Sequence, residues 1–430
     1  MFGKRRGEEM RDVVVVKEKK PTFLTPNVLI ASCFLLYTSM MAAKGVFLAE
    51  IAYLMEIFSV DKATASLANT YYFVSYAGVQ VLLFFIVKRL NVRKLLTYTV
   101  PFAAVATAAM GLSRGIGDMY VLFAVCGLFQ AGVYCGCNAT LTAYLPARYL
   151  SRANSVMNLG YASGTVIAFV FSAMCVRFDL WRVPFFVMGA FLFFATCFYT
   201  VCAKYAYVLK RDEAVPSGAS SSSDVASETP FLNVNTPKKR ALFYSTDLIL
   251  VFLITCLYYA INNWISTLLV DVYSMSQDIS IYITILAPTL IALGPMMTIR
   301  YCDKHRDFIR GGVVFTIFAL PIPFLLAFFY SKSLILAFVL SVVYIILING
   351  VKSIGLSVMA FKLRGVVNTA EYTAIANAVA SLAGGVAPTV VGKIIDGYGW
   401  NVSYFAVFAV TALVLVAMVV IDIMVRKAQR

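Results

Sequence analysis

The chain has 430 residues, of which 61% are hydrophobic and 13% are charged. A soluble domain has about 45–50% apolar and about 25% charged residues, so this composition excludes a soluble globular protein and indicates a chain that crosses a membrane many times. The formal net charge of +15 would suit nucleic-acid binding, but the basic residues lie in short runs between hydrophobic stretches, so we expect no nucleic-acid partner.

Hydrophobic runs of about 20 residues, the length that crosses a bilayer as a helix, occur twelve times. They begin near Asn27, Ser66, Leu95, Met119, Ala153, Val183, Asp247, Ile279, Gly311, Leu334, Ala370 and Tyr404. We therefore predict an all-α integral membrane protein with twelve transmembrane helices in two six-helix halves. No cleavable signal peptide is apparent, because the first run is far longer than the apolar core of such a peptide.

The first span follows a basic tail, residues 1–26, and contains a lysine, Lys44. A charge at membrane depth costs about 2.5–3.5 kcal/mol, so we expect Lys44 to face a protein interior or a watery cavity. Tyr37 lies two turns earlier on the same face. Glu50 lies about 240° around the helix from Lys44, so the two are not partners. We regard Glu50 as a candidate for proton coupling, with an entrance residue or an ion-pair partner as the alternatives.

Polar side chains at helical spacing mark the spans that we expect to face a cavity. On the second span these are Asn69, Tyr72, Tyr76 and Gln80, and on the fifth they are Asn158 and Tyr161. The third, sixth, ninth and twelfth spans carry little polarity, which indicates contact with lipid. The alternative is that each polar residue only joins two helices, an interaction of about 0.6 kcal/mol on average.

A Ser-rich segment that is charged at both ends, residues 205–245, divides the chain. It cannot bury a core, so we predict a flexible cytoplasmic linker. The linker separates an N-terminal half, residues 27–204, from a C-terminal half, residues 246–425, which a short tail, residues 426–430, follows.

In the C-terminal half, polar residues recur on the seventh span and a second lysine lies on the tenth. Tyr258 and Asn262 are four residues apart, and their neighbours Tyr259 and Asn263 form a second such pair. Lys352 can supply a cation from this half. The sequence leaves open whether it points inward.

The distribution of Lys and Arg predicts the orientation. With both termini in the cytoplasm, 28 of the 36 basic residues fall in cytoplasmic segments and five in outer loops. The other three are Lys44, Lys352 and Lys393, and Lys393 lies near an outer helix end, where its side chain can reach water. We expect a monomeric, multi-pass protein of the cell membrane, plasma or inner.

Several kinds of chemistry are not expected from this chain. The nine cysteines are scattered without a CxxC pair, and the sole histidine, His305, lies in a cytoplasmic loop. We therefore predict no metal site, no cofactor and no catalytic pair of nucleophile and base, so the protein is not expected to be an enzyme. No P-loop motif occurs, so the driving force would be a gradient or an exchange.

Three stretches carry a family resemblance. They are "IGLSVMAFKLRGVVNTAEYTAIANAVASLAGGVAPTVVGKIIDGYGW" (354–400), "LYYAINNWISTLL" (257–269) and "KGVFLAEIAYL" (44–54). With the twelve spans and the central linker, the chain resembles the major facilitator superfamily, and these strings are similar to its organophosphate:phosphate antiporter branch. The resemblance covers about residues 30–425.

The resemblance implies a phosphate site with one arginine on the first helix and one on the seventh, at the positions of Lys44 and Tyr258. A lysine of that branch corresponds to Gln80, and a histidine to Tyr161. One cation thus remains, as a lysine, which cannot form the two-pronged contact that arginine makes with phosphate. Two facing lysines would suit an anion, whereas one would suit a monocarboxylate or a zwitterion.

We therefore predict a secondary active transporter, an antiporter or a symporter, that moves a small polar, anionic organic solute by alternating access, with a coupling proton or an exchanged anion. The predicted substrate-binding residues are Lys44, Tyr37, Tyr76, Gln80, Asn158, Tyr161, Tyr258, Asn262 and Lys352, with Glu50 as the proton-coupling candidate. Two alternatives stay open: a non-transporting sensor of the same fold, and a drug or lipid exporter with a mainly apolar cavity.

Overall fold

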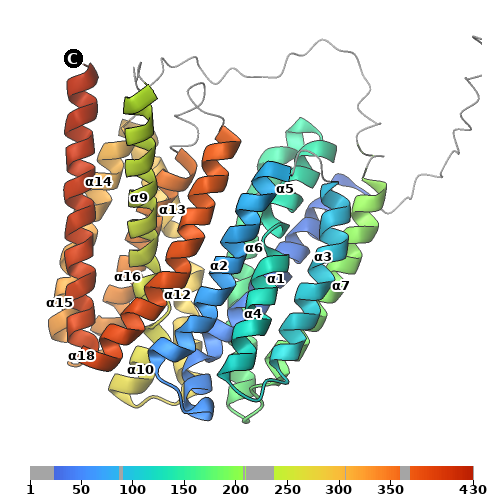
Figure 1. Ribbon diagram of the computed structural model, residues 1–430, viewed down its shortest axis with the longest axis horizontal. Coiled ribbons are helices and arrows are strands. Elements are labelled where there is room, and N and C mark those ends of the chain that lie inside the picture. Colours follow the sequence, from blue (N-terminus) through green and yellow to red (C-terminus); the bar gives the residue numbers. More distant parts are fainter. Residues whose placement is uncertain are drawn as a thin grey trace, which may run out of the picture.

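A computed structural model of the protein describes residues 24–86, 91–206, 209, 237–305, 307–358 and 369–429. Every regular element in these ranges is a helix, and Figure 1 shows their arrangement in two halves. The N-terminal half contains α1 (Pro26–Phe58), α2 (Lys62–Ile86), α3 (Val92–Met110), α4 (Ile116–Gln130), α5 (Val133–Tyr144), α6 (Ala147–Val176) and α7 (Val183–Tyr205). The C-terminal half contains α9 (Pro237–Asn262), α10 (Ile265–Tyr273), α11 (Gln277–Thr284), α12 (Leu286–Leu290), α13 (Leu293–His305), α14 (Phe308–Ala319), α15 (Pro321–Phe329), α16 (Leu334–Ser353), the π-helical turn η2 (Ile354–Val358) and α18 (Thr369–Gln429).

Within the described residues, nine segments are long and apolar enough to cross a membrane. One of them, Ile375–Ile423, is 49 residues long and holds two crossings, because the backbone of Gly399 breaks α18 with a φ of 83°. The helices α2 and α3 are more polar and are not among these nine, but they correspond to the second and third predicted spans. The helical membrane fold is thus confirmed, and the arrangement agrees with the twelve predicted spans.

Local capping explains where several of these helices begin and end. The Thr25 side chain accepts a hydrogen bond from the backbone N–H of Val28 at the start of α1, and Ser59 ends that helix in the left-handed conformation. The Asp61 carboxylate caps the start of α2 by accepting a hydrogen bond of 2.8 Å from the backbone N–H of Thr64. Hydrogen bonds from the hydroxyl and the backbone N–H of Thr64 hold the pKa of Asp61 below its ordinary value.

Two helices extend into the segments that are predicted to be the linker and the C-terminal tail. The helix α9 begins at Pro237, within residues 205–245, and α18 continues to Gln429, within residues 426–430. Hydropathy marks where the apolar stretch ends, whereas backbone hydrogen bonds can extend a helix beyond it through polar residues. Residues 1–23 and 210–236, most of the predicted N-terminal tail and linker, lie outside the described residues.

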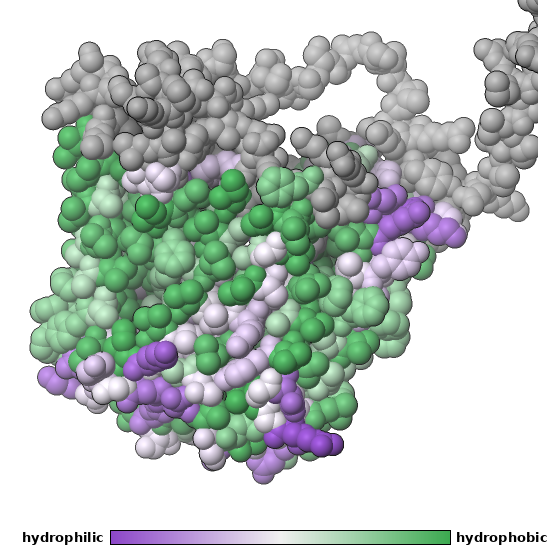
Figure 2. All heavy atoms as spheres, in the orientation of Figure 1, coloured by the Kyte–Doolittle hydropathy of each residue, from purple (hydrophilic) through white to green (hydrophobic). Residues whose placement is uncertain are grey.

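Apolar side chains cover the flank of the bundle, and polar ones gather along its lower rim (Figure 2). Exposed apolar residues include Phe102 on α3, Phe194 on α7, Phe318 on α14 and Val416 near the end of α18. A belt of this kind suits lipid tails. These helices are the third, sixth, ninth and twelfth predicted spans, so their apolar composition matches their place at the lipid boundary.

Small residues bring neighbouring helices close together. A Cβ atom on Gly164 of α6 would lie 2.3 Å from the backbone oxygen of Thr38 on α1. A Cβ atom on Gly385 of α18 would lie 3.1 Å from the Cα of Thr70 on α2. Close backbone packing of this type is a common way for membrane helices to associate. The α2–α18 contact joins the two halves.

An ion-pair cluster joins the halves at the end that holds the loops 59–61 and 274–276, which we call the outer end because the basic residues predict it to lie outside. The Lys62 ammonium lies 3.0 Å from Asp271 and 3.4 Å from Asp396. Asp396 also accepts a hydrogen bond of 3.0 Å from the backbone N–H of Ala63. The helix α10 and the bend of α18, which hold Asp271 and Asp396, lie at the lower end of the bundle in Figure 1.

Short polar side chains extend this seal toward the middle of the bundle. The Thr70 hydroxyl donates to the Gly385 carbonyl oxygen over 2.7 Å, and the Ser66 and Thr389 hydroxyls lie 3.2 Å apart. Together with the ion pairs, these hydrogen bonds join α2 to α10 and α18 near this end. The conformation is therefore closed on the predicted outer side.

Candidate functional site

The side chain of Lys44 points into the bundle. Its ammonium lies 4.2 Å from the centre of the Phe73 ring and 5.1 Å from that of Tyr72, both on α2. The negative face of an aromatic ring attracts a cation and offsets part of its loss of water. No carboxylate among the described residues lies within ion-pairing distance of Lys44, so its charge is left without a counter-charge from those residues.

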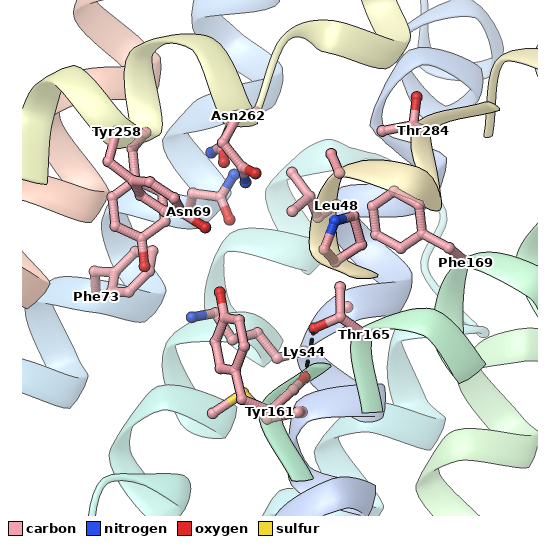
Figure 3. Close-up of a pocket in the computed structure, with 16 residues that line it drawn as sticks. Lys44, Leu48, Asn69, Phe73, Tyr161, Thr165, Phe169, Tyr258, Asn262 and Thr284 are labelled. Carbon is pink, nitrogen blue, oxygen red and sulfur yellow. Dashed lines mark hydrogen bonds between the residues drawn. The ribbon is translucent and has the colours of Figure 1, made fainter. Parts of the chain in front are cut away.

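A cavity of about 40 Å³ lies beside Lys44, between the two halves (Figure 3). Its wall consists of Met41, Lys44, Gly45, Leu48, Asn69, Phe73, Tyr161, Thr165, Phe169, Tyr258, Tyr259, Asn262, Asn263, Thr284, Ala287 and Pro288. One water needs roughly 10–15 Å³ of such volume, so the cavity has room for about three waters. In this conformation its own side chains nearly fill the site.

Two tyrosines meet across the cavity, one from each half. Figure 3 shows the hydroxyls of Tyr161 on α6 and Tyr258 on α9 pointing toward one another, with the Lys44 ammonium near Tyr161. Their side chains are close enough to interact. Hydroxyl groups beside an ammonium can donate hydrogen bonds to one anion, so these three residues form a cationic, hydrogen-bonding end of the cavity.

Lys352, a second cation, comes from the C-terminal half; it is not on the cavity wall, but it contacts Tyr258, which is. Its ammonium lies 4.0 Å from the centre of the Tyr258 ring and 6.0 Å from that of Tyr259. It interacts electrostatically with Lys44. Within the described residues, no carboxylate pairs with Lys352. Two like charges from opposite halves thus lie near the same cavity without counter-charges.

Three amides gather at the other end of the cavity, where the seventh span is broken. The helix α9 ends at Asn262 and α10 begins at Ile265, so Asn262 and its neighbour Asn263 both reach the wall. Asn69 on α2 faces them, and Figure 3 shows its amide near that of Asn262. The Asn69 amide nitrogen and the Asn263 amide oxygen have no hydrogen-bond partner among the described residues. An unsatisfied buried polar group costs about 1–3 kcal/mol.

Of the residues predicted from the sequence, Lys44, Tyr161, Tyr258 and Asn262 lie on the wall of the cavity. Tyr37 does not, and its ring packs against Tyr134 with centroids 5.1 Å apart.

Three further predictions fall elsewhere. Tyr76 stacks on Tyr72 at 5.8 Å, and Gln80 lies beside Tyr76, both away from the cavity wall. Asn158 lies on α6, but its side chain is outside the described residues.

Glu50 is separate from the cavity. Its side chain is fully buried where α1 meets α6, and neither carboxylate oxygen has a hydrogen-bond partner among the described residues. The Ser172 side chain on α6 is its polar neighbour, and the Ser172 hydroxyl oxygen is likewise without a hydrogen-bond partner among those residues. Burial of an unpaired carboxyl group is costly, so packing alone does not account for Glu50 at this contact.

The sequence prediction omitted several wall residues. Asn69 lies on the polar face of α2 that the spacing of polar residues marks, and Tyr259 and Asn263 form the second polar pair of the seventh span. These signals were present in the sequence, but nothing there indicated the break after Asn262. Phe73 and Phe169 carry no polar signal, because an aromatic residue in a membrane span is ordinarily packing.

Among the residues that the structure describes, no three His, Cys, Asp or Glu side chains come together as a metal site would need. The cavity wall has one cation, Lys44, together with three amides, five hydroxyls and seven apolar residues or glycines. Such a wall can bind a polar anion through charge and hydrogen bonds.

The sequence matches the family model described as Major Facilitator Superfamily over residues 33–370. No curated protein sequence matches the chain.

Solved transporter structures share the fold. A bacterial homolog of the human lysosomal transporter Spinster, inward-facing and occupied, gives a TM-score of 0.67 at 16% identity, covering 94% of this chain and 97% of that one. The nucleoside transporter NupG gives a TM-score of 0.65 at 14% identity, covering 91% of this chain and 98% of that one. At such identities the similarity concerns the fold alone.

Proposed function

The chain belongs to the Major Facilitator Superfamily, and on that premise we propose that it is a secondary active transporter of a small polar, anionic organic solute that works by alternating access. One observation carries the proposal. Lys44 and Lys352 come from opposite halves, lie near the same cavity, and have no counter-charge among the described residues. An anion between them would relieve their repulsion and supply the missing charge.

The closed outer end supports alternating access. The contacts of Lys62, Ser66 and Thr70 with the C-terminal half seal one side of the cavity. An anion that binds residues of both halves pulls them together from either side, so binding is coupled to the relative position of the halves.

The finer resemblance to organophosphate:phosphate antiporters is part of the proposal. Tyr258 stands where that branch implies an arginine on the seventh helix. The Lys352 ammonium lies 4.0 Å from the Tyr258 ring centre, so the tenth helix supplies a cation near the same place. Two lysines in place of two arginines favour a smaller or less charged anion than a phosphate ester, because lysine lacks the planar two-pronged contact.

The proposed roles of the remaining residues follow their positions. Tyr161, Tyr258 and Asn262 contact the solute, and Tyr37, Tyr76, Gln80 and Asn158 line its route from the cytoplasmic side. Glu50 exchanges the coupling proton at the α1–α6 contact. We further propose a monomer in the cell membrane with both termini in the cytoplasm.

Thermal stabilisation of the purified protein by phosphate esters, carboxylates, amino acids and sugars tests the proposal. A ligand at 100 times its dissociation constant adds about 2.7 kcal/mol to the free energy of unfolding, which is measurable. We expect at least one anion to stabilise the wild type and to lose most of its effect in Lys44→Gln and Lys352→Gln. Lys393→Gln, the third lysine within a span, is the control and should behave as the wild type.

Two results would reject the anion carrier. If Lys44→Gln responds to anions as the wild type does, or if only apolar drugs or lipids stabilise both proteins, the result favours a drug or lipid exporter. If an anion binds but is not taken up into proteoliposomes, the result favours a non-transporting sensor.

A further inference from the structure

The amide end of the cavity has hydrogen-bonding capacity that the protein itself leaves unused. Asn69 and Asn263 are 3% and 4% exposed, and they come from opposite halves. The Asn69 amide nitrogen, a donor, and the Asn263 amide oxygen, an acceptor, lack hydrogen-bond partners among the described residues. Both side chains line the cavity that Lys44 borders.

A single neutral group can satisfy both amides. A hydroxyl accepts one hydrogen bond and donates another, so it can accept from Asn69 and donate to Asn263 at the same time. A methyl group can do neither. An ammonium can donate to the Asn263 oxygen, but it cannot accept a hydrogen bond from the Asn69 nitrogen. The positive charge of Lys44 also repels it across the small cavity.

We propose that Asn69 and Asn263 form a hydroxyl-recognition subsite, and that the transported solute is a hydroxylated organic anion rather than an unsubstituted anion or an amino acid. The anionic group lies toward Lys44, Tyr161 and Tyr258, and the hydroxyl lies between the two amides. This inference rests on the proposed function, because the anionic end is the one described there. It adds the class of solute and the residues that select it.

The cavity volume indicates what can occupy the site when no solute is bound. Its volume of about 40 Å³ has room for about three waters, but the Asn69 nitrogen and the Asn263 oxygen are buried in this conformation, so their side chains must shift before a water or a solute reaches them. A solute hydroxyl that reaches both amides makes the missing hydrogen bonds, whereas an apolar group leaves them unmade. Selection against the unsubstituted anion follows from that difference.

Matched compounds test the subsite. L-lactate, propionate and L-alanine differ only in a hydroxyl, a hydrogen or an ammonium, and gluconate with hexanoate and glycerol 3-phosphate with propyl phosphate repeat the comparison at other sizes and charges. Dissociation constants come from thermal stabilisation of the purified full chain. In at least one set, we expect the hydroxylated anion to bind the wild type at least about tenfold more tightly than its unsubstituted analogue. L-alanine should bind no better than propionate.

The variants Asn69→Leu and Asn263→Leu should bring that ratio close to one while binding of the unsubstituted anion is retained. Asn69→Ser and Asn263→Ser keep a hydroxyl at each position and should restore part of the preference, which a variant that misfolds would not. The matched control is Asn349→Leu. Asn349 lies on α16, and its amide donates to the Ile291 carbonyl oxygen over 3.1 Å, outside the cavity wall.

Failure of this inference and failure of the proposed function give different results. A ratio near one in the wild type for every set, or a ratio unchanged in both leucine variants, overturns the subsite even if anions bind through Lys44. If no anion binds but glycerol does, and Asn263→Leu abolishes that binding, the subsite stands and the anionic solute is wrong. If neither anions nor glycerol bind, both are wrong.

Discussion

The ammonium of Lys352 lies over the ring of Tyr258, 4.0 Å from its centre. The two residues come from α16 and α9, which are separated by more than 90 positions in the chain but belong to the same half. The ring holds a positive charge beside the cavity without neutralising it, as a carboxylate would. That difference leaves the charge available to a solute.

Replacement of Tyr258 by leucine should therefore weaken anion binding. A cation–π contact contributes about 0.5–2 kcal/mol, so we expect the dissociation constant of an anion that binds the wild type to rise by about 2- to 30-fold. Tyr258→Phe retains the ring and should lose only the hydroxyl contribution. Equal losses in the two variants, measured by thermal stabilisation, would show that the ring does not position Lys352.

A disulfide between the halves should stop transport. The Ser66 and Thr389 hydroxyls lie 3.2 Å apart, so cysteines at these positions are close enough to be bridged. In Ser66→Cys/Thr389→Cys we expect oxidation to abolish uptake into proteoliposomes and a reducing agent to restore it. Each single cysteine variant should be insensitive to oxidation. Uptake that continues with the bridge in place would contradict movement of the halves at the outer end.

Gly164→Ala should destabilise the protein, because a Cβ atom there would lie 2.3 Å from the Thr38 backbone oxygen. Overpacking of this kind typically costs about 1–3 kcal/mol and should lower the melting temperature. Gly78 on α2 is the matched control, since no atom lies within 4 Å of a Cβ placed on it. Gly78→Ala should leave the melting temperature unchanged or raise it slightly. A similar response in both variants would show that α1 and α6 can separate without cost.

Glu50→Gln should separate proton-driven accumulation from exchange. The Glu50 carboxyl group is fully buried beside Ser172 and away from the cavity wall, so the amide should fit without loss of solute binding. We expect uptake driven by a pH gradient to fall toward background, while exchange of the same solute across the vesicle membrane continues. If both activities persist, Glu50 has no part in coupling. If both are lost, its role is structural.

Much of the fold could be predicted, because span-length apolar runs show directly in the sequence. For the site, the spacing of polar residues predicts a helix face but not the depth along the helix at which a cavity lies. Tyr76 and Gln80 share a face with Asn69, yet at 1.5 Å per residue they lie about 10–17 Å further along α2, beyond the cavity. Tyr37 lies about 10 Å from Lys44 for the same reason.

The remaining site features depend on tertiary structure. In a regular helix, the two polar pairs of the seventh span cannot both face the cavity directly, because Tyr258 and Tyr259 point about 100° apart. The break after Asn262 lets both asparagines reach the wall, and no residue type in "YYAINNWIS" requires a break at that point. The inward position of Lys352 likewise depends on how α16 packs against α9, which the sequence of neither helix specifies.

The outer seal is built mostly from hydroxyl groups, backbone atoms and partly exposed ion pairs, so water can replace each partner when the halves part. A hydrogen bond exchanged in this way contributes only about 0.5–1.5 kcal/mol, and an exposed ion pair about 0–1 kcal/mol. These contacts therefore oppose opening of the outer end only weakly. A seal of long apolar side chains would hold the carrier in one form. In the proposed proton-coupled carrier, the gradients of solute and proton together would then decide the direction of net flow.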